Sequence, residues 1–443
     1  MPTLPEETEF TSDPLWLQSY KNQAAALLEK TPVPTEDQEN WRYSDISNFR
    51  PDNFKPASKA VYVADTIRPE FLPACSAVIK LNNDGYAEKT DGGGKGGIRV
   101  INLAEDFDAE NPSETDFADP SSIKDLVRKY LEPSGDDSFF ELLAKAFVKT
   151  PILLYIPPNY KAELPIAVIH SLHDPSVSGT KDNLVSADSA AGETYFPSLV
   201  IFADKGAEVK VLEVLLSDGA SSLVVPRTFC WVQEGAHLAY EQLQVLGKNT
   251  QHYGHQYGFV RENGFLDSFS VSLGARMSRT ETSSVLSERQ ASSNLYSLYF
   301  AGDDQIKDMR TYQDHLAPHT KSELIFKGAV DGEARSVYTG LIHMAKGAVR
   351  SEASQTNRNL VLSEKASADS VPNLSIEEND VKCSHASAVG PIDKELSFYL
   401  ETKGIDPSSA EKLITLGFFR DLLNSAPVTE LNGYIYNTIA NKL

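Results

Sequence analysis

The chain has 443 residues, of which 41% are hydrophobic, enough to bury the cores of two or three domains. Its 62 acidic and 41 basic residues leave a formal net charge of −21, which disfavours binding to nucleic-acid backbones and to anionic membrane surfaces. The three cysteines are odd in number and widely separated, no signal-peptide pattern opens the sequence, and no apolar run reaches membrane-spanning length. We therefore expect a cytoplasmic protein without disulfides.

Residues 1–149 are predicted to form a region of helices with a few strands. Asp13, followed by proline, is typical of a helix N-cap, and the apolar residues after it recur with helical spacing until Thr31. The same spacing predicts two further helices over residues 121–132 and 138–148.

Two short strands are predicted over residues 77–81 and 98–103, with the glycine-rich sequence DGGGKGG between them. This loop lacks the Lys-Ser/Thr ending and the strand-to-helix context of a phosphate-binding loop. We interpret it as a flexible hairpin connection between the two strands.

From residue 150 to residue 390 the sequence consists of many short runs of β-branched and aromatic residues separated by turns. Such strands could build a sandwich, a propeller or a stacked β-helix. Several turns repeat one shape, and the glycines of three of them, Gly206, Gly235 and Gly264, are 29 residues apart. Because a solenoid reuses one corner in every coil, and glycine supplies the positive φ that a corner often needs, we predict a parallel β-helix. A polar insertion over residues 171–194 is expected to be a mobile loop.

Residues 391–443 are predicted to form a helical C-terminal domain. Asp393 is expected to cap a first helix that ends at Gly404, Asp406 to cap a second, and Pro427 to begin a third. Helices therefore flank the predicted solenoid on both sides.

Cys383 and His385 are the strongest candidates for metal ligands. Residues two apart in a strand point to the same face, so a thiolate and an imidazole are presented together. These donors suit a soft transition metal, but two of them leave a tetrahedral site half filled, and another surface must supply the rest. The alternative is that Cys383 is a small buried residue and His385 a polar residue with ordinary hydrogen bonds.

Other histidine pairs have spacings that resemble metal sites but lack the remaining features of such sites. None has a C-x-x-C partner, and the sequence Leu-Ala-Pro between the last two breaks a helix. A structural or solvated role is favoured for all six. They are His170, His173, His252, His255, His315 and His319.

The segment from His315 to Leu416 resembles the core of the SufB/SufD scaffold family of the SUF iron–sulfur cluster assembly machinery. The motifs that carry the resemblance are HLAPHTKSELIFKGAVDGEARSVYTGLIHM, SEASQTNRNLVLSEKASADSVPNLSIEENDVKCSHASAVGPIDKELSFYL and KGIDPSSAEKLITLGFF. The family's N-terminal Trp-Arg-Tyr motif is present as Trp41, Arg42 and Tyr43. The SufB branch is expected to have a cysteine at the position of Asn357 and Glu-His-Glu-Ala at residues 382–385, so both departures favour the SufD branch.

The resemblance implies a right-handed parallel β-helix with helical ends that acts as a scaffold without catalytic activity. It further implies pairing with SufB through the β-helix and docking of the ATPase SufC on the C-terminal helices, and we assign this docking to Leu413, Ile414, Phe418 and Phe419. His385, with Cys383 as the weaker candidate, would face a SufB cysteine and share a transient iron–sulfur cluster, with no cofactor tightly bound in the isolated chain. An unpaired β-helix edge also makes a homodimer of the isolated chain an expectation.

Two other functions stay open at this point. A cytoplasmic β-helix enzyme that acts on carbohydrate would gather carboxylates and basic residues on one face, and Glu377, Glu378 and Asp380 offer an acidic run. A purely structural homodimeric β-helix protein would instead keep Cys383 and His385 in its core.

Overall fold

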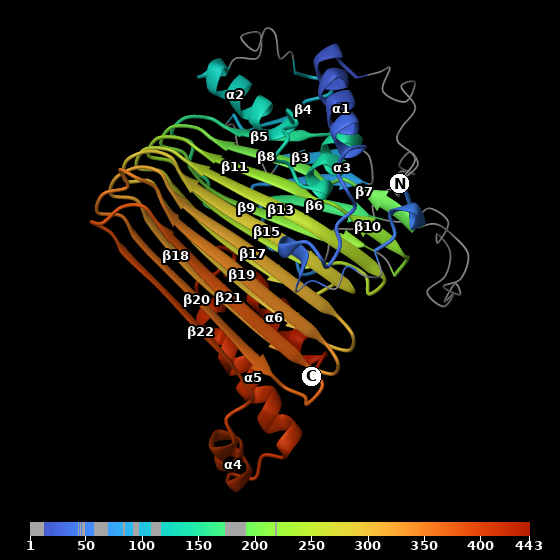
Figure 1. Ribbon diagram of the computed structural model, residues 1–443, viewed down its shortest axis with the longest axis vertical. Helices are drawn as coiled ribbons and strands as arrows, with labels where there is room; N and C mark the ends of the chain where they lie inside the picture. Colours follow the sequence, from blue (N-terminus) through green and yellow to red (C-terminus); the bar gives the residue numbers. More distant parts are fainter. Residues whose placement is uncertain are drawn as a thin grey trace.

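The computed structural model describes residues 13–443, apart from residues 43, 45, 47–48, 57–69, 83–84, 92–96, 108–116, 173–191 and 218. The chain folds into a flattened β-solenoid of about seven turns, with helices near both of its ends (Figure 1). The predicted β-helix is thus confirmed. None of the helices in the described ranges is long and apolar enough to cross a membrane.

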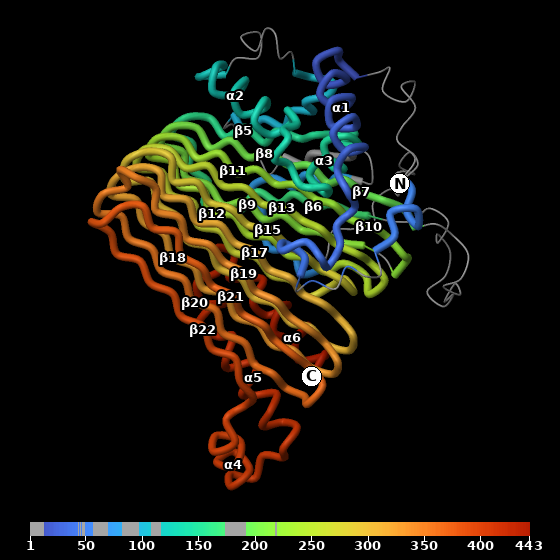
Figure 2. Tube along the Cα trace, in the orientation of Figure 1, coloured from blue at the N-terminus to red at the C-terminus, as the bar shows by residue number. Residues whose placement is uncertain are grey.

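Two mainly parallel sheets form the facing walls of the solenoid, and successive coils lie in register on one another (Figure 2). Within the described residues, sheet A consists of twelve strands: β1 (Phe54–Pro56), β4 (Arg99–Asn102), β5 (Ile152–Ile156), β7 (Gly192–Tyr195), β8 (Ser198–Ala203), β10 (Ser222–Val224), β11 (Arg227–Val232), β13 (Thr250–Val260), β15 (Met277–Leu286), β17 (Ile306–His315), β19 (Arg335–Met344) and β21 (Ser367–Ile376).

Sheet B consists of ten strands over the same part of the chain. They are β2 (Ala77–Asn82), β3 (Gly85–Asp91), β6 (Ile166–Leu172), β9 (Glu208–Ser217), β12 (His237–Val245), β14 (Phe265–Ser272), β16 (Ser292–Ala301), β18 (Lys321–Val330), β20 (Glu352–Val361) and β22 (Lys382–Gly390). From β11 onward the chain alternates between the two sheets, so each of these strands pairs with the strand one coil before it and, except at the sheet edges, with the strand one coil after it.

The corner that leads from sheet A to sheet B uses left-handed backbone conformations, as the repeated turn predicts. Gly206 and Gly235 have φ values of +65° and +66°. In the next coil, however, the positive φ of +54° belongs to Asn263 and not to Gly264, because asparagine also tolerates this region. Gly264 is required for a different reason, since a Cβ there would lie 3.0 Å from the carbonyl oxygen of Arg261.

The solenoid interior changes from aliphatic to polar along its length. In the first coils, buried residues such as Ile152, Val168 and Ile201 pack in one cluster. In the last coils, buried polar side chains replace many of them, and six of these bond to one another: Gln313, His315, Thr320, Ser322, Asn357 and Asn359. Gln355 is buried in the same region. The end of the solenoid formed by β21 and β22 therefore has the more polar interior.

Helices of the N-terminal region pack on the outer face of sheet A (Figure 1). They are α1 (Leu15–Leu28), α2 (Pro120–Leu131) and α3 (Phe139–Phe147), with short 3-10 turns η2 (Glu39–Trp41) and η3 (Pro51–Asn53). The three predicted helices are confirmed, but Asp13 is not the N-cap. Pro14 holds that position, and the Asp13 carboxylate pairs with Lys21 Nζ at 2.6 Å.

The predicted hairpin between residues 77–81 and 98–103 is wrong. β2 pairs antiparallel with β3 in sheet B, whereas β4 pairs with β5 in sheet A. The glycine-rich loop therefore connects the two walls, and its residues 92–96 lie outside the described ranges, as does most of the polar insertion. Because β2 and β4 extend both sheets, the first 149 residues contribute to the solenoid itself.

The C-terminal helices are α4 (Lys394–Thr402), α5 (Pro407–Leu423), η6 (Thr429–Leu431) and α6 (Asn432–Ala440). Asp393 and Asp406 cap α4 and α5 through backbone N–H groups, and Gly404 has a φ of +84°, as predicted. Helices α5 and α6 pack on the outer face of sheet B, whereas α4 has no buried residue and projects beyond the last coil (Figure 1).

Candidate metal centre

The last coil leaves one end of the solenoid open. Among the described strands, β22 pairs only with β20 and β21 pairs only with β19, so each is the edge of its sheet. Most residues of β22 are exposed, although the equivalent inward positions of β20 are buried. A strand with unpaired N–H and C=O groups is a template for pairing with another chain.

Cys383 and His385 face the interior side of this open coil. The register pairs Cys383 with Ala353 and His385 with Gln355, and both β20 residues are buried inside the solenoid. Because neighbouring strands in register point their side chains to the same side, the two candidate ligands share the inward face. This placement agrees with the spacing argument from the sequence.

The two side chains differ in how available they are. Cys383 is partly buried against Ile342, Met344 and Ala353, and this burial raises the pKa of its thiol. The raised pKa disfavours the thiolate that would bind a metal. His385 is exposed. The imidazole is therefore the better placed donor of the two.

The site is incomplete on this chain. Among the described residues, no group of three or more histidine, cysteine, aspartate or glutamate side chains is arranged to hold a metal ion. Iron in proteins requires more than two donors, so a metal held by His385 and Cys383 would need further ligands from another molecule. Asn357, two residues from Gln355 in the same inward row, is fully buried and donates to the carbonyl oxygen of Phe326.

Sequence patterns gave no indication of Gln355, which lies directly beside His385 in the register. Its side chain is 1% exposed, and neither its amide nitrogen nor its amide oxygen has a hydrogen-bond partner within the described part of the chain. The only available signal is the alternation of β20, which makes Gln355 an inward residue, and that alternation does not identify its neighbour on β22.

Among the other candidate histidines, His170, His252 and His315 are buried and bond to neighbouring side chains. His170 bonds to Glu213 at 2.9 Å, and burial lowers the pKa of His252 to about 3. His315 bonds to Thr320 and Ser322, and burial lowers its pKa to about 4. His319 occupies a solenoid corner with a φ of +61°, and His173 lies outside the described residues.

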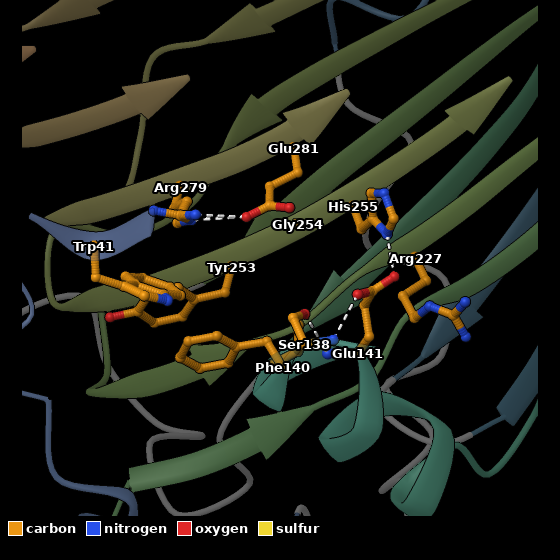
Figure 3. A pocket seen from close by; sticks show the side chains of 11 residues that line it. Trp41, Ser138, Phe140, Glu141, Arg227, Tyr253, Gly254, His255, Arg279 and Glu281 are labelled. Carbon is orange, nitrogen blue, oxygen red and sulfur yellow. Dashed lines mark hydrogen bonds and ion pairs between the residues drawn. The ribbon is translucent and has the colours of Figure 1, made fainter. Parts of the chain in front are cut away.

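His255 lines a small cavity between α3, the Trp41 segment and sheet A, whose walls combine aromatic and charged side chains (Figure 3). Its Nδ1 lies 2.8 Å from the Glu141 carboxylate, and the Arg279 guanidinium stacks 3.7 Å from the centre of the Trp41 ring. The free space is about 20 Å³, which is room for about one water molecule and none for a cofactor. The cluster therefore attaches the N-terminal region to the solenoid.

The acidic run after β21 forms a turn. Glu378 accepts backbone N–H bonds from Gly347 and Asn379, which lower its pKa, and Asp380 lies 3.5 Å from Arg350. Glu377 lies 3.8 Å from His343. These carboxylates therefore lie beside groups of the solenoid corner and form no paired acid and base facing a cavity among the described residues.

The residues assigned to SufC docking lie on α5 but differ in exposure. Leu413 is 51% exposed, Ile414 and Phe418 are partly buried, and Phe419 is fully buried against sheet B. Phe419 thus supports the helix from beneath and is not part of its outer surface. Further large apolar side chains are exposed on α4, namely Leu396, Phe398 and Tyr399.

Comparison with known proteins identifies relatives over nearly the whole chain. Residues 185–418 match the family model described as SUF system FeS cluster assembly, SufBD core domain. The chain is 30% identical to the iron–sulfur cluster assembly protein SufD of Escherichia coli K12, over 94% of this chain and 90% of that protein. It is 24% identical to SufD of Bacillus subtilis 168, over 98% and 96%. A SufBD family protein of Staphylococcus aureus is 21% identical over 96% and 88%.

Proposed function

This chain belongs to the SufBD family of iron–sulfur cluster assembly proteins, and from this premise we propose that it is a SufD-type scaffold subunit that pairs with SufB and binds the ATPase SufC. In this proposal the nascent iron–sulfur cluster is the cargo of the complex, formed where the two scaffold subunits meet. The chain itself positions ligands and does not catalyse a covalent step.

One observation carries the proposal: the exposed imidazole of His385 faces the open last coil, beside Cys383, on a strand with a free edge. A neutral imidazole is a good ligand for iron, and the thiol of Cys383 can add a second donor once a metal stabilises its thiolate. Ligands from SufB would complete the set. A site shared between subunits can form and open as they move.

The open end also supports the pairing. β21 and β22 offer unpaired backbone groups, so a strand of SufB can extend either sheet. These two strands also expose three apolar side chains, Leu374, Ile376 and Val389. Burying them against SufB would stabilise the contact between the two subunits. In the isolated chain the same surface can pair with a second copy.

The C-terminal helices would transmit the action of SufC. Helix α4 and the outer side of α5 expose Phe398, Tyr399 and Leu413, while the inner side of α5 is fixed to sheet B through Phe419. A force applied to these helices is therefore passed to the solenoid wall. Dimerisation of two SufC subunits on ATP binding would shift the population of SufB–SufD arrangements and so open or close the shared site.

The test is to assemble the complex anaerobically with SufB and SufC and to measure bound iron, acid-labile sulfide and visible absorbance. We expect His385→Ala to leave the complex intact in size-exclusion chromatography while iron and sulfide fall by about tenfold, because a ligand is lost. Cys383→Ser should have a smaller effect. Ser387→Ala, on the same inward row, is the matched control and should load normally. Normal loading of His385→Ala would refute the proposed ligand.

A further inference from the structure

Within the described ranges, the buried amide of Gln355 makes no hydrogen bond, whereas the amides of Asn357 and Asn359 in the same inward row do. Asn359 donates to Asn357 Oδ1 at 2.8 Å and accepts from the Tyr299 hydroxyl, and Asn357 donates to the carbonyl of Phe326. Gln355 is 1% exposed, yet both polar atoms of its amide lack a partner in the part of the chain that the structure describes. An unpaired buried amide is destabilising, so its presence requires a reason.

The fold makes room for this amide in the solenoid interior. Across from it, on β19, is Gly340, where an added Cβ would lie 2.5 Å from Gln355 Nε2 and 2.5 Å from the Tyr338 hydroxyl oxygen. Any side chain at this position would displace the amide. The Gln355 amide therefore extends between the two sheets, one coil away from the open end.

The residue next to Gln355 in the open coil is His385. The two are paired in the register of β20 and β22, and their side chains share the inward face. Parallel strands lie about 4.8 Å apart, so a glutamine side chain can reach an imidazole on the adjacent strand. The Ser370 hydroxyl, on the inward row of the facing strand β21, is a second buried group for which the described residues supply no hydrogen-bond partner.

An imidazole that binds a metal through one ring nitrogen presents an N–H group at the other. Such N–H groups are usually held by an oxygen acceptor, which fixes the ring orientation and makes the ligand more basic. We propose that Gln355 is the positioning residue of the candidate centre and that its side-chain carbonyl accepts the N–H of His385 when the imidazole binds iron. This inference rests on the proposed function and adds the residue that orients its ligand.

The first test uses the isolated full-length chain. If the role of Gln355 is to orient His385, the amide contributes nothing to the stability of the isolated chain. Gln355→Leu then removes two unpaired polar atoms at similar volume, and we expect the melting temperature to stay the same or rise by about 2 °C. If the amide instead stabilised the fold, the same substitution would lower the melting temperature. A clear fall in melting temperature would overturn the inference.

The second test uses the complex with SufB and SufC, loaded with iron and sulfide and then reduced to a paramagnetic state. Pulsed electron paramagnetic resonance detects the remote nitrogen of a metal-bound imidazole, and its quadrupole coupling depends on the hydrogen bond that it makes. We expect Gln355→Leu to change this coupling and to lower iron retention by about tenfold. Gln355→Glu, which keeps an acceptor oxygen, should preserve the bond, and Thr356→Val, on the outer face, is the control.

The outcomes separate the two proposals. A remote-nitrogen signal that is present and unchanged in Gln355→Leu would overturn the role of Gln355 and leave the role of His385 intact. No histidine nitrogen signal in the wild-type complex would overturn both.

Discussion

Glu141 and His255 form an ion pair that joins α3 to sheet A, with their nearest atoms 2.8 Å apart. Burial lowers the pKa of His255, but the charge and hydrogen bond of Glu141 outweigh this effect and leave the pKa raised. Burial alone would raise the pKa of Glu141, yet the same partner holds it well below its usual range. Both charged forms are therefore favoured in the folded protein.

His255→Gln should lower the free energy of unfolding by about 3 kcal/mol near pH 6, because Glu141 is left without its charged partner. The raised pKa means that the contribution of His255 is complete below its unfolded pKa of about 6.5 and is lost as pH rises through the folded value. The difference from wild type should therefore shrink in alkaline solution. Urea denaturation at several pH values measures it.

The control for this variant is an exposed ion pair. Lys161 and Glu208 lie 2.9 Å apart, but their side chains are 71% and 56% exposed, so Lys161→Gln should leave stability unchanged. A loss for His255→Gln as small as that of the control at every pH would contradict the assigned role of the pair.

At the residue scale, the sequence predicts the common face of Cys383 and His385, because that follows from the two-residue period of a strand alone. It does not predict Gln355 as a neighbour, since the pairing of residues 355 and 385 depends on the length of the coil between them. Nor does it distinguish Phe419 from Phe418, because which side of α5 is buried depends on its contact with sheet B.

At the scale of elements, the last helices are attached to sheet B through a buried carboxyl group. Glu241 on β12 is fully buried and accepts the N–H of Val428 at 2.8 Å, while Lys210 donates to the carbonyl of Pro427. Burial raises the pKa of Glu241 to about 8. The Val428 N–H bond and the charge of Lys210 oppose this rise, whereas the negative charges of Glu430 and Asp267 add to it. The group is thus largely uncharged at neutral pH.

Glu241→Gln should reduce the pH dependence of stability. In the wild type, the raised pKa means that stability falls as pH rises from about 4.5 to about 8, where the folded protein also loses the proton. Glutamine imitates the protonated carboxyl group and keeps an acceptor for Val428, so at pH of about 9 the variant should be more stable by roughly 2 kcal/mol. Thermal unfolding at acidic and alkaline pH measures this, and parallel pH profiles for both proteins would contradict it.

The two sides of α5 should respond differently to substitution. Leu413→Asp changes a residue that is 51% exposed, so we expect weaker SufC binding with a stability change within about 0.5 kcal/mol. Phe419→Ala empties a buried position and should lower stability by about 4 kcal/mol. Pull-down assays and denaturation of the isolated chain separate the effects. Full SufC retention by Leu413→Asp would refute docking on the outer side of α5.

Helix ends and turns could be predicted from the sequence where neighbouring residues alone determine them. The caps at Asp393 and Asp406 and the corner glycines Gly206 and Gly235 depend on a few neighbouring residues, and the structure confirms them. The hairpin over the glycine-rich loop was wrong because β4 pairs with β5, some fifty residues later, and this contact has no local signature.

At the scale of the whole molecule, the solenoid is asymmetric. Its first coils are aliphatic inside and are covered by α1, α2 and α3, whereas its later coils bury more polar side chains and end in β21 and β22, the edge strands of the two sheets (Figure 1). The repeated turn predicted the solenoid, but not this difference between the ends. The open end is where the candidate ligands lie, so assembly with a partner and formation of the metal site would occur together.

The most direct measurement is whether a histidine of this chain binds the cluster iron. The chain is labelled with ¹⁵N-histidine, assembled with unlabelled SufB and SufC, loaded and reduced, and examined by electron–nuclear double resonance. The account predicts a ¹⁵N coupling typical of a nitrogen bonded to iron, present in the wild type and absent in His385→Ala. A loaded wild-type complex without ¹⁵N coupling, or a coupling that persists in His385→Ala, would contradict it.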